Sequence, residues 1–515
     1  MKLRALAATL LVAAVTTLAA QEQADEKVIA AIKTEGFQRS HVMETLSWLT
    51  DVHGPRLTNS PGYRAAAEWA KTQLEQWGLV HAQLEPWGTF GPGWSVDRHS
   101  VEMVAPSYAR LMAYPHAWTR STPGAVTGRP VLVEIASKND FPKYKGKLKG
   151  AIVLFNRPKA ALSRFTAPAR RYTDAELGGE AAAIHPGKPE SYQAEMAEWE
   201  KEGLSNDREI MQFFRDEGIA VLLEPSVRDG LIVEVAALGY FISNTDPWFP
   251  AFVVAKEHYG RLLRLLDKKV PVTLEITLKT TIHDQDLQGH NVVAEIPGAD
   301  PAIGNQVVML GGHLDSWHSG TGTADNAAGC AVAMEAVRIL KAIGVRPRRT
   351  IRVALWDGEE QAFYGSVGYI KKHFGDPDTK ATKPEQALVS AYFNVDNGSG
   401  RIRGVHLQGN EAVRPIFEAW LKPFNYLGAT ALTTHNTGGT DHLLFHAIGV
   451  PGFQFVQDPL DYETQVHHTS LDVYESAVAD DLQQASVVLA SFVYHAAMRD
   501  GMLPRHAMPP PWKAK

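Results

Sequence analysis

From Asn291 onward, apolar runs typical of buried strands alternate with segments of helical periodicity. The expected strands are 291–296, 307–311, 351–356 and 390–395, and the expected helices are 325–343, 363–373, 412–420 and 479–499. This alternation predicts an α/β fold with a mixed, largely parallel sheet flanked by helices on both faces. Upstream, Ser60 and Pro61 carry the signature of a helix start, an N-cap followed by proline at the first helical position.

The stretch from 125 to 276 has a different pattern. Short β-type runs at 130–135, 151–155, 220–223 and 231–235 surround a charged, helix-prone stretch at 173–215. We therefore expect a β-rich insert at 125–276 that splits the α/β domain into 21–124 and 277–505. A chain of 515 residues is long enough for several domains. The proline-containing end, 506–515, is expected to be a loose extension.

The first 20 residues resemble a signal peptide. Lys2 and Arg4 precede an apolar run from residue 6 to 18, and small residues follow at Ala19 and Ala20. This order predicts export to the periplasm or the extracellular space, with cleavage near Ala19 or Ala20. The run is shorter than the ~20 residues that span a bilayer, so we expect no membrane anchor. The single cysteine, Cys330, excludes an internal disulfide and is expected to be a small buried hydrophobe.

The net charge of -6 and the pI of about 6.4 give no basic surface for nucleic acid. Polar residues instead gather where the predicted strands end, which is where sites form in open α/β sheets. They are His313, Asp315, Glu359, Glu360 and Asp396, together with Asp325 at the head of a helix and His468 in the text HHTSLD.

Each of these residues has an ordinary explanation when it is taken alone. A lone histidine is usually a satisfied polar residue, Asp325 could be an N-cap, and the Glu359–Glu360 pair could be a solvated turn. Together, however, two imidazoles and three carboxylates with a further free base suit two zinc ions about 3.5–4 Å apart that share a carboxylate and a water. We therefore predict a hydrolase with two zinc ions per chain, in which Asp315 orients the imidazole of His313.

At these residues the chain resembles the cocatalytic zinc exopeptidase family, which includes bacterial leucyl aminopeptidases and glutamate carboxypeptidases, and above all its carboxypeptidase Q branch. The matching text is GGHLDSW, then residues 320–329, RPRRTIRVALWDGEEQAFYGS, NVDNGSG and HHTSLD. The inserted region resembles a protease-associated domain at YKGKLKGAIV, residues 144–153. Two departures are the length of 173–215 and His318, where similar chains tend to carry aspartate.

The resemblance implies a role for each residue of the predicted site. His313 and Asp396 would hold one zinc, Glu360 and His468 the other, and Asp325 would bridge the two. Glu359 would act as general base and then as general acid. The resemblance also selects His468 over His467 as the ligand, and it implies a cis peptide bond between Asp325 and Asn326.

We expect an exported metallo-exopeptidase that removes N-terminal residues from short peptides, dipeptides included, because a dizinc cage needs no extra residues to bind a free α-amine. A carboxypeptidase or dipeptidase of the carboxypeptidase Q type is the alternative. It must also recognise a terminal carboxylate, for which the candidates are Arg401, Arg403, Thr440, Asp441 and His442. A glutaminyl cyclase-like acyltransferase with one zinc, and a receptor-like protein without activity, stay as further alternatives, and a homodimer is left open.

Overall fold

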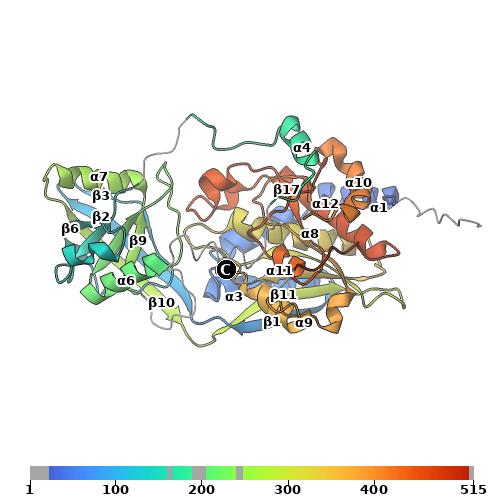
Figure 1. Cartoon of the computed structure of the whole chain (residues 1–515), viewed down its shortest axis with the longest axis horizontal. Coiled ribbons are helices and arrows are strands. Elements are labelled where there is room, and N and C mark those ends of the chain that lie inside the picture. Colours follow the sequence, from blue (N-terminus) through green and yellow to red (C-terminus); the bar gives the residue numbers. More distant parts are fainter. Residues whose placement is uncertain (1–21, 159–164, 188–204, 239–247, 510–515) are drawn as a thin grey trace, which may run out of the picture.

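The computed structural model describes residues 22–158, 165–187, 205–238 and 248–509. The predicted signal peptide and residues 510–515 of the expected extension lie outside this part. Figure 1 shows a larger lobe, which contains both ends of the described chain, and a smaller lobe made from the middle of the sequence. Of the helices in the described ranges, none is both long enough and apolar enough to cross a membrane.

The larger lobe is built on an eight-stranded sheet in the order β1-β11-β13-β12-β14-β17-β15-β16. β12 pairs in parallel with β13 and β14, and β14 pairs in parallel with β17, whereas β1, β11 and β13 pair antiparallel towards one edge. The predicted α/β fold with a mixed, largely parallel sheet is therefore confirmed. The strands are β1 (Val80–Thr89), β11 (Gln288–Ile296), β12 (Val307–His313), β13 (Thr350–Trp356), β14 (Val389–Asn394), β15 (Ile402–His406), β16 (Ala431–Thr433) and β17 (Gly452–Gln457).

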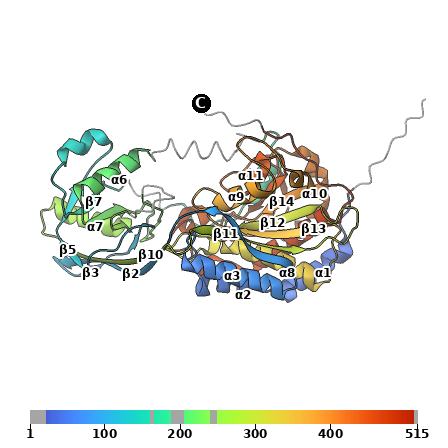
Figure 2. The same cartoon turned by 90° about the horizontal axis from the view of Figure 1, so that it is seen from below.

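Helices cover both faces of this sheet (Figure 2). One face packs on α1 (Glu26–Gln38), α2 (Val42–Ser47), α3 (Pro61–Gln76), α8 (Ala328–Ala342), α10 (Arg414–Leu421) and α12 (Ala479–Met498). The other face packs on α9 (Tyr364–His373) and α11 (His442–Ala447). α3 begins as the sequence predicts, because the Ser60 side chain accepts the backbone N–H of Tyr63.

The smaller lobe contains two sheets, ordered β3-β2-β10-β5 and β4-β9-β8-β7-β6. β2 pairs with β10 along its whole length, so the first sheet draws on residues before 125 and after 276. The bounds of the insert stay a prediction, and this pairing favours limits near residues 93 and 283. The elements are β2 (Gly93–Ala105), β3 (Ala109–Arg110), β4 (Ala113–Pro115), β5 (Val126–Gly128), β6 (Pro130–Val133), β7 (Ile152–Phe155), α6 (Ser205–Glu217), β8 (Val221–Pro225), β9 (Ala251–Val254), α7 (Lys256–Asp267) and β10 (Thr273–His283).

The prediction of a strand at 231–235 is wrong. This segment forms one isolated β-bridge, between Glu234 and Thr469 of the larger lobe. Its apolar residues, Val233 and Val235, are buried with Leu57 and Trp317 between the two lobes. The apolar run therefore reflects packing against the other lobe and not membership of a sheet.

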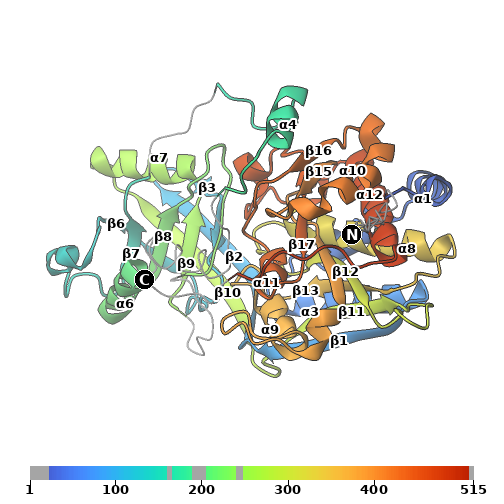
Figure 3. The same ribbon diagram turned by 45° about the vertical axis from the view of Figure 1, so that its right-hand side comes forward.

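The charged stretch at 173–215 divides between the two lobes. Its first part forms α4 (Asp174–Ala181), which begins with a capping box between Thr173 and Glu176. α4 lies on the larger lobe beside the edge strand β16 (Figure 3), where the Thr433 hydroxyl donates to Glu180. The part from Ser205 onward forms α6 in the smaller lobe, and residues 188–204 lie outside the described ranges.

Candidate metal centre

Nitrogen and oxygen atoms of His313, Asp325 and Asp396 converge where the central strands end. His313 Nε2 lies 3.2 Å from Asp325 Oδ1 and 3.3 Å from Asp396 Oδ1. His313 is the last residue of β12, and Asp396 follows β14, the parallel neighbour of β12. These ligand atoms are close enough together to hold one metal ion.

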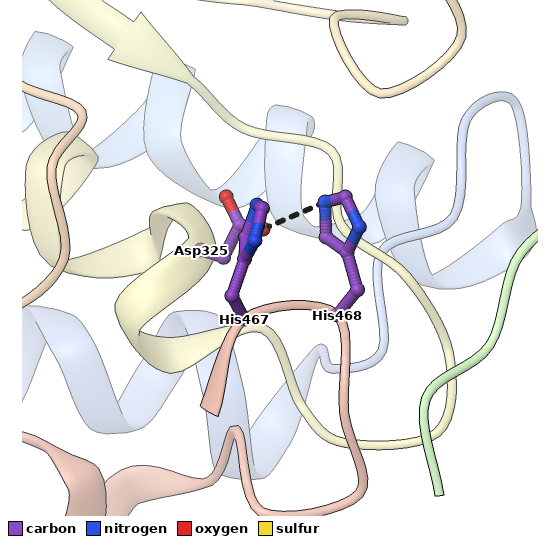
Figure 4. A group of neighbouring side chains, drawn as sticks. All are labelled: Asp325, His467 and His468. Carbon is purple, nitrogen blue, oxygen red and sulfur yellow. Dashed lines mark ion pairs between the residues drawn. The ribbon is translucent and has the colours of Figure 1, made fainter. Parts of the chain in front are cut away.

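A second group of ligands shares Asp325. His468 Nε2 lies 3.2 Å from Asp325 Oδ2 and 2.9 Å from Glu360 Oε2. His467 also faces Asp325 Oδ2, at 3.6 Å, and its ring lies against that of His468 with centroids 3.9 Å apart (Figure 4). The five predicted ligands thus meet in one place, with the two oxygens of Asp325 turned to different groups and with His467 as an additional neighbour.

The turn that carries Asp325 is held by specific contacts. The Asp325–Asn326 peptide bond is cis, as expected. The Asp472 carboxylate accepts the backbone N–H groups of Ala324 and Asp325, at 2.6 and 3.1 Å. A Cβ atom on Gly329 would lie 2.0 Å from the carbonyl oxygen of Val395, so only glycine lets the start of α8 approach the end of β14 this closely.

Arg56 is a second support that the sequence did not reveal. Its guanidinium group is completely buried and donates to four backbone carbonyls, those of Leu49, Leu314, Thr321 and Gly322. It thereby joins the segment after His313 to the turn before Asp325. Nothing in the sequence around Arg56 marks it, because its partners are backbone atoms and three of the four are more than 250 residues away.

Asp315 supports the other two ligand segments. Its carboxylate accepts the backbone N–H groups of Glu359 and Glu360, each at 3.2 Å, and the Thr58 hydroxyl at 3.0 Å. His313 Nδ1 lies 3.0 Å from the backbone carbonyl of Asp315 and 3.6 Å from its carboxylate. The nearer contact of the imidazole is therefore the Asp315 carbonyl, while the carboxylate mainly fixes the glutamate turn.

The site concentrates negative charge in a buried place. Burial raises the pKa of Glu359 well above its ordinary range; His313 opposes this, while Asp396 and Asp441 add to it. Burial, assisted by Asp325, raises the pKa of Glu360 to about 7. Burial alone would lower the pKa of His313, but Asp396 and Glu359 outweigh it and raise that pKa.

This donor set fits divalent zinc. Two imidazoles and three carboxylates are ligands that zinc accepts, and positive charge here would relieve the crowding of buried carboxylates. Glu360 Oε1 is buried without a hydrogen-bond partner, as expected of an oxygen that a cation would bind.

The residues predicted to bind substrate are engaged in contacts within the protein. Arg401 pairs with Asp481 and Arg403 with Asp458, both at 2.8 Å, so their donors are committed to buried carboxylates within the protein and are not free for a substrate. Thr440 accepts from the Asn394 side chain at 2.8 Å. His442 lies 3.0 Å from the carbonyl of Thr437, and burial lowers its pKa to about 3.

Asp441 differs from the other candidates because the metal centre influences it. Burial raises its pKa to about 7, and the charges of His313 and Asp396 act on it in opposite directions. Its carboxylate accepts the Ser366 hydroxyl.

Two further residues singled out in the sequence, Cys330 and His318, each contact a backbone carbonyl. Cys330 is buried, and its thiol lies 3.0 Å from the carbonyl of His313. Burial raises the pKa of this thiol to about 12, in agreement with the expectation of an unreactive residue. His318 lies 2.8 Å from the carbonyl of Pro115, and burial lowers its pKa to about 4, so this histidine is neutral at physiological pH.

The chain is similar to known peptidases in sequence and in fold. Residues 291–493, which include all five predicted ligands, match the model of peptidase family M28. Human carboxypeptidase Q is 25% identical over 487 residues, which cover 93% of this chain and 90% of that protein. Among solved structures, a peptidase M28 precursor from Shewanella amazonensis has a TM-score of 0.66 at 22% identity and covers 94% of this chain and 99% of that one. BSAP, a zinc aminopeptidase from Bacillus subtilis, has a TM-score of 0.58 at 18% identity and covers 90% and 95%.

Proposed function

We propose that the chain belongs to peptidase family M28 and is a zinc-dependent exopeptidase that works with two zinc ions in the cage described above. The observation that carries this proposal is the shared position of Asp325. One of its oxygens lies beside His313 and the other beside His468. A carboxylate with one oxygen in each group is what a pair of ions with a common ligand requires.

In this proposal His313 and Asp396 hold one ion, Glu360 and His468 hold the other, and Asp325 bridges them. Bound zinc supplies positive charge that polarises the scissile carbonyl and makes water a better nucleophile at neutral pH. Asp315 and Asp472 position the ligands, because they fix the backbone of the Glu359–Glu360 turn and of the Asp325 turn.

We assign the proton transfers to Glu359. Its carboxylate takes a proton from the attacking water and passes it to the amine that leaves when the peptide bond breaks. A carboxylate suits both steps, since it can accept the proton of the attacking water and then release it to the more basic amine.

For the direction of attack we propose removal of N-terminal residues from short peptides and dipeptides. An N-terminal amine needs no recognition residue beyond the cage, and the candidate carboxylate donors Arg401 and Arg403 are committed to Asp481 and Asp458. A carboxypeptidase or dipeptidase is the second candidate, since similarity to human carboxypeptidase Q extends along 93% of the chain.

The test combines metal analysis with a substrate screen. We expect two zinc ions per chain and cleavage of a tripeptide that stops when its N-terminus is acetylated. Cleavage that survives N-acetylation and stops on C-amidation would make this a carboxypeptidase. One zinc ion per chain together with cyclisation of an N-terminal glutamine peptide would instead indicate an acyltransferase.

We further propose export with cleavage near Ala19 or Ala20, and a protease-associated module as the core of the smaller lobe. The N-terminal sequence of the protein recovered outside the cytoplasm tests the first of these proposals. A homodimer stays open, and sedimentation of the purified protein decides it.

A further inference from the structure

The loop that carries His467 and His468 lies between two segments of the inserted region, one that runs along the larger lobe and one that belongs to the smaller lobe. We call residues 458–470 the histidine loop. One neighbouring segment, residues 168–172, precedes α4. The other, residues 228–235, contains the wrongly predicted strand. Both are far from the histidine loop in sequence, and each contacts it through backbone atoms.

The first segment binds the start and the middle of the histidine loop. The Arg170 N–H donates to the carbonyl of Leu460 at 2.9 Å, and the Thr464 hydroxyl donates to the carbonyl of Pro168 at 2.7 Å. Arg171 follows directly after Arg170. Its guanidinium donates to Asp458 at 2.8 Å and to Asp481, on α12, at 2.6 Å.

The second segment binds the end of the loop, including His468 itself. The Val235 N–H donates to the carbonyl of His468 at 3.1 Å, and the Ser470 N–H donates to the carbonyl of Val233 at 2.9 Å. Arg228 donates to the carbonyl of Glu463 and is held in place by Glu234. Three successive parts of the histidine loop are thus attached to the inserted region.

The other ligands obtain their support from the larger lobe. His313 and Asp396 stand at the ends of β12 and β14 in the central sheet. The segments of Asp325 and Glu360 are held by Asp472 and Asp315. His468 also has a left-handed backbone, with φ of 59°. A non-glycine residue keeps this conformation only where its surroundings impose it.

We propose that residues 168–172 and 228–235 form a clamp that positions His468, so that the inserted region sets the zinc affinity of the Glu360–His468 site and not that of the His313–Asp396 site. The clamp rests on the proposed two-zinc function. Arg171 and Arg228 are its positioning residues, because they contact the histidine loop without reaching the metal ligands. The contacts that hold a ligand in place commonly alter metal affinity by about 10–100-fold.

The test measures zinc release from the full-length, zinc-loaded protein during titration with a competing chelator. The variants are Arg171→Ala, Arg228→Ala and Arg171→Lys, and the matched control is Arg157→Ala. Arg157 is also on the smaller lobe, with its side chain 44% exposed against 39% for Arg171, but its partners Asp267 and Glu134 belong to that lobe. Removal of Arg171 leaves Asp458 paired with Arg403 and Asp481 paired with Arg401, so no buried charge loses its last partner.

We expect Arg171→Ala and Arg228→Ala each to lower the affinity for one of the two zinc ions by about tenfold and to leave the affinity for the other unchanged. Arg171→Lys should lose less zinc affinity than Arg171→Ala, and Arg157→Ala should bind both ions as tightly as the wild type. Amide exchange in residues 458–470 should become faster in the two alanine variants and not in the control. An equal loss of affinity for both ions would indicate a general loss of structure and would overturn the clamp. Alanine variants that bind zinc like Arg157→Ala would also overturn it.

The wild-type titration separates this proposal from the proposed function. A wild-type protein with two ions and unaffected variants refutes only the clamp. A wild-type protein that binds fewer than two ions refutes the two-zinc function, and the clamp with it. If Arg171→Ala fails to fold, as judged by thermal unfolding, Arg228→Ala and Arg171→Lys decide the result.

Discussion

The backbone N–H of Asp325 donates to the Asp472 carboxylate at 3.1 Å, so the proposed bridging ligand is fixed by a residue outside the proposed ligand set. The same carboxylate accepts the N–H of Ala324. In Asp472→Asn only one of the two side-chain positions accepts a hydrogen bond, and the Asp325 turn loses support. We expect zinc affinity to fall by about 10–100-fold, as measured by chelator competition. Unchanged affinity would show that the turn holds its shape without Asp472.

Replacement of Glu359 by glutamine should separate metal binding from catalysis. Both zinc ions are expected to remain, because Glu359 is not among the proposed ligands. Turnover should fall by roughly a hundredfold or more, since an amide cannot act as general base. The measurements are zinc content and peptide hydrolysis, with the exposed Glu385→Gln as control. Full turnover in Glu359→Gln would remove this residue from the mechanism.

The two adjacent histidines should differ in their effect on zinc. His468 Nε2 has two close carboxylate neighbours, Glu360 and Asp325, whereas His467 lies 3.6 Å from Asp325 and 4.0 Å from the exposed Glu463. We therefore expect His468→Ala to lose one zinc ion per chain and His467→Ala to keep both. Metal analysis of the two purified variants decides between them, and the opposite result would exchange their roles.

The buried ion cluster around Arg338 should be important for stability. Arg338 on α8 pairs with Glu335 at 2.7 Å and with Glu35 on α1 at 2.8 Å, and all three side chains are buried. Arg338→Ala leaves two buried carboxylates without this partner, so the free energy of unfolding should fall by about 3–5 kcal/mol. Arg39→Ala removes a partner of Glu35 that is 60% exposed and should cost less than about 1 kcal/mol. Urea unfolding at fixed zinc concentration measures both, and equal effects would contradict the argument.

Stability should also depend on pH through Glu85. Burial raises the pKa of this carboxyl, but hydrogen bonds with His373 and Lys372 outweigh burial, so the pKa lies below the ordinary 4.5. The ionised form is thus favoured in the folded state, and its contribution is present above about pH 4.5 and is lost as the pH falls through the lower folded value. Glu85→Gln should be less stable than the wild type at pH 7, with a difference that shrinks below pH 4.5. A difference that stays constant with pH would contradict this assignment.

The sequence was most informative where a residue and its partners follow neighbouring strands. β12, β13 and β14 are parallel, so His313, the Glu359–Glu360 pair and Asp396 reach the same edge of the sheet. Each strand was recognisable from its own apolar run, and the ligands follow directly. The helix start at Ser60 was predictable for the same reason, because a cap is a local interaction.

Interactions between distant segments could not be predicted in this way. Arg56 acts on backbone carbonyls in other segments, and no local pattern identifies a residue with that task. The apolar run at 231–235 indicated buried side chains but not which lobe would cover them, so the expected strand was wrong. The place of α4 beside β16 likewise depends on Thr433 and Glu180, whose side chains meet only in the folded protein.

The pairing of β1 with β11 also bears on how the chain is made. Thr89 pairs with Gln288, so about 200 residues, nearly all of the smaller lobe, are synthesised between the two strands. At ribosomal rates of about 5–20 residues per second, β1 waits roughly 10–40 s for its neighbour. Throughout that interval the N-terminal helices and β1 have no sheet to pack on, and β1 presents an unpaired edge. β2 and β10 of the smaller lobe are also joined across this interval. The time needed to synthesise the smaller lobe thus determines when the larger lobe can begin to close.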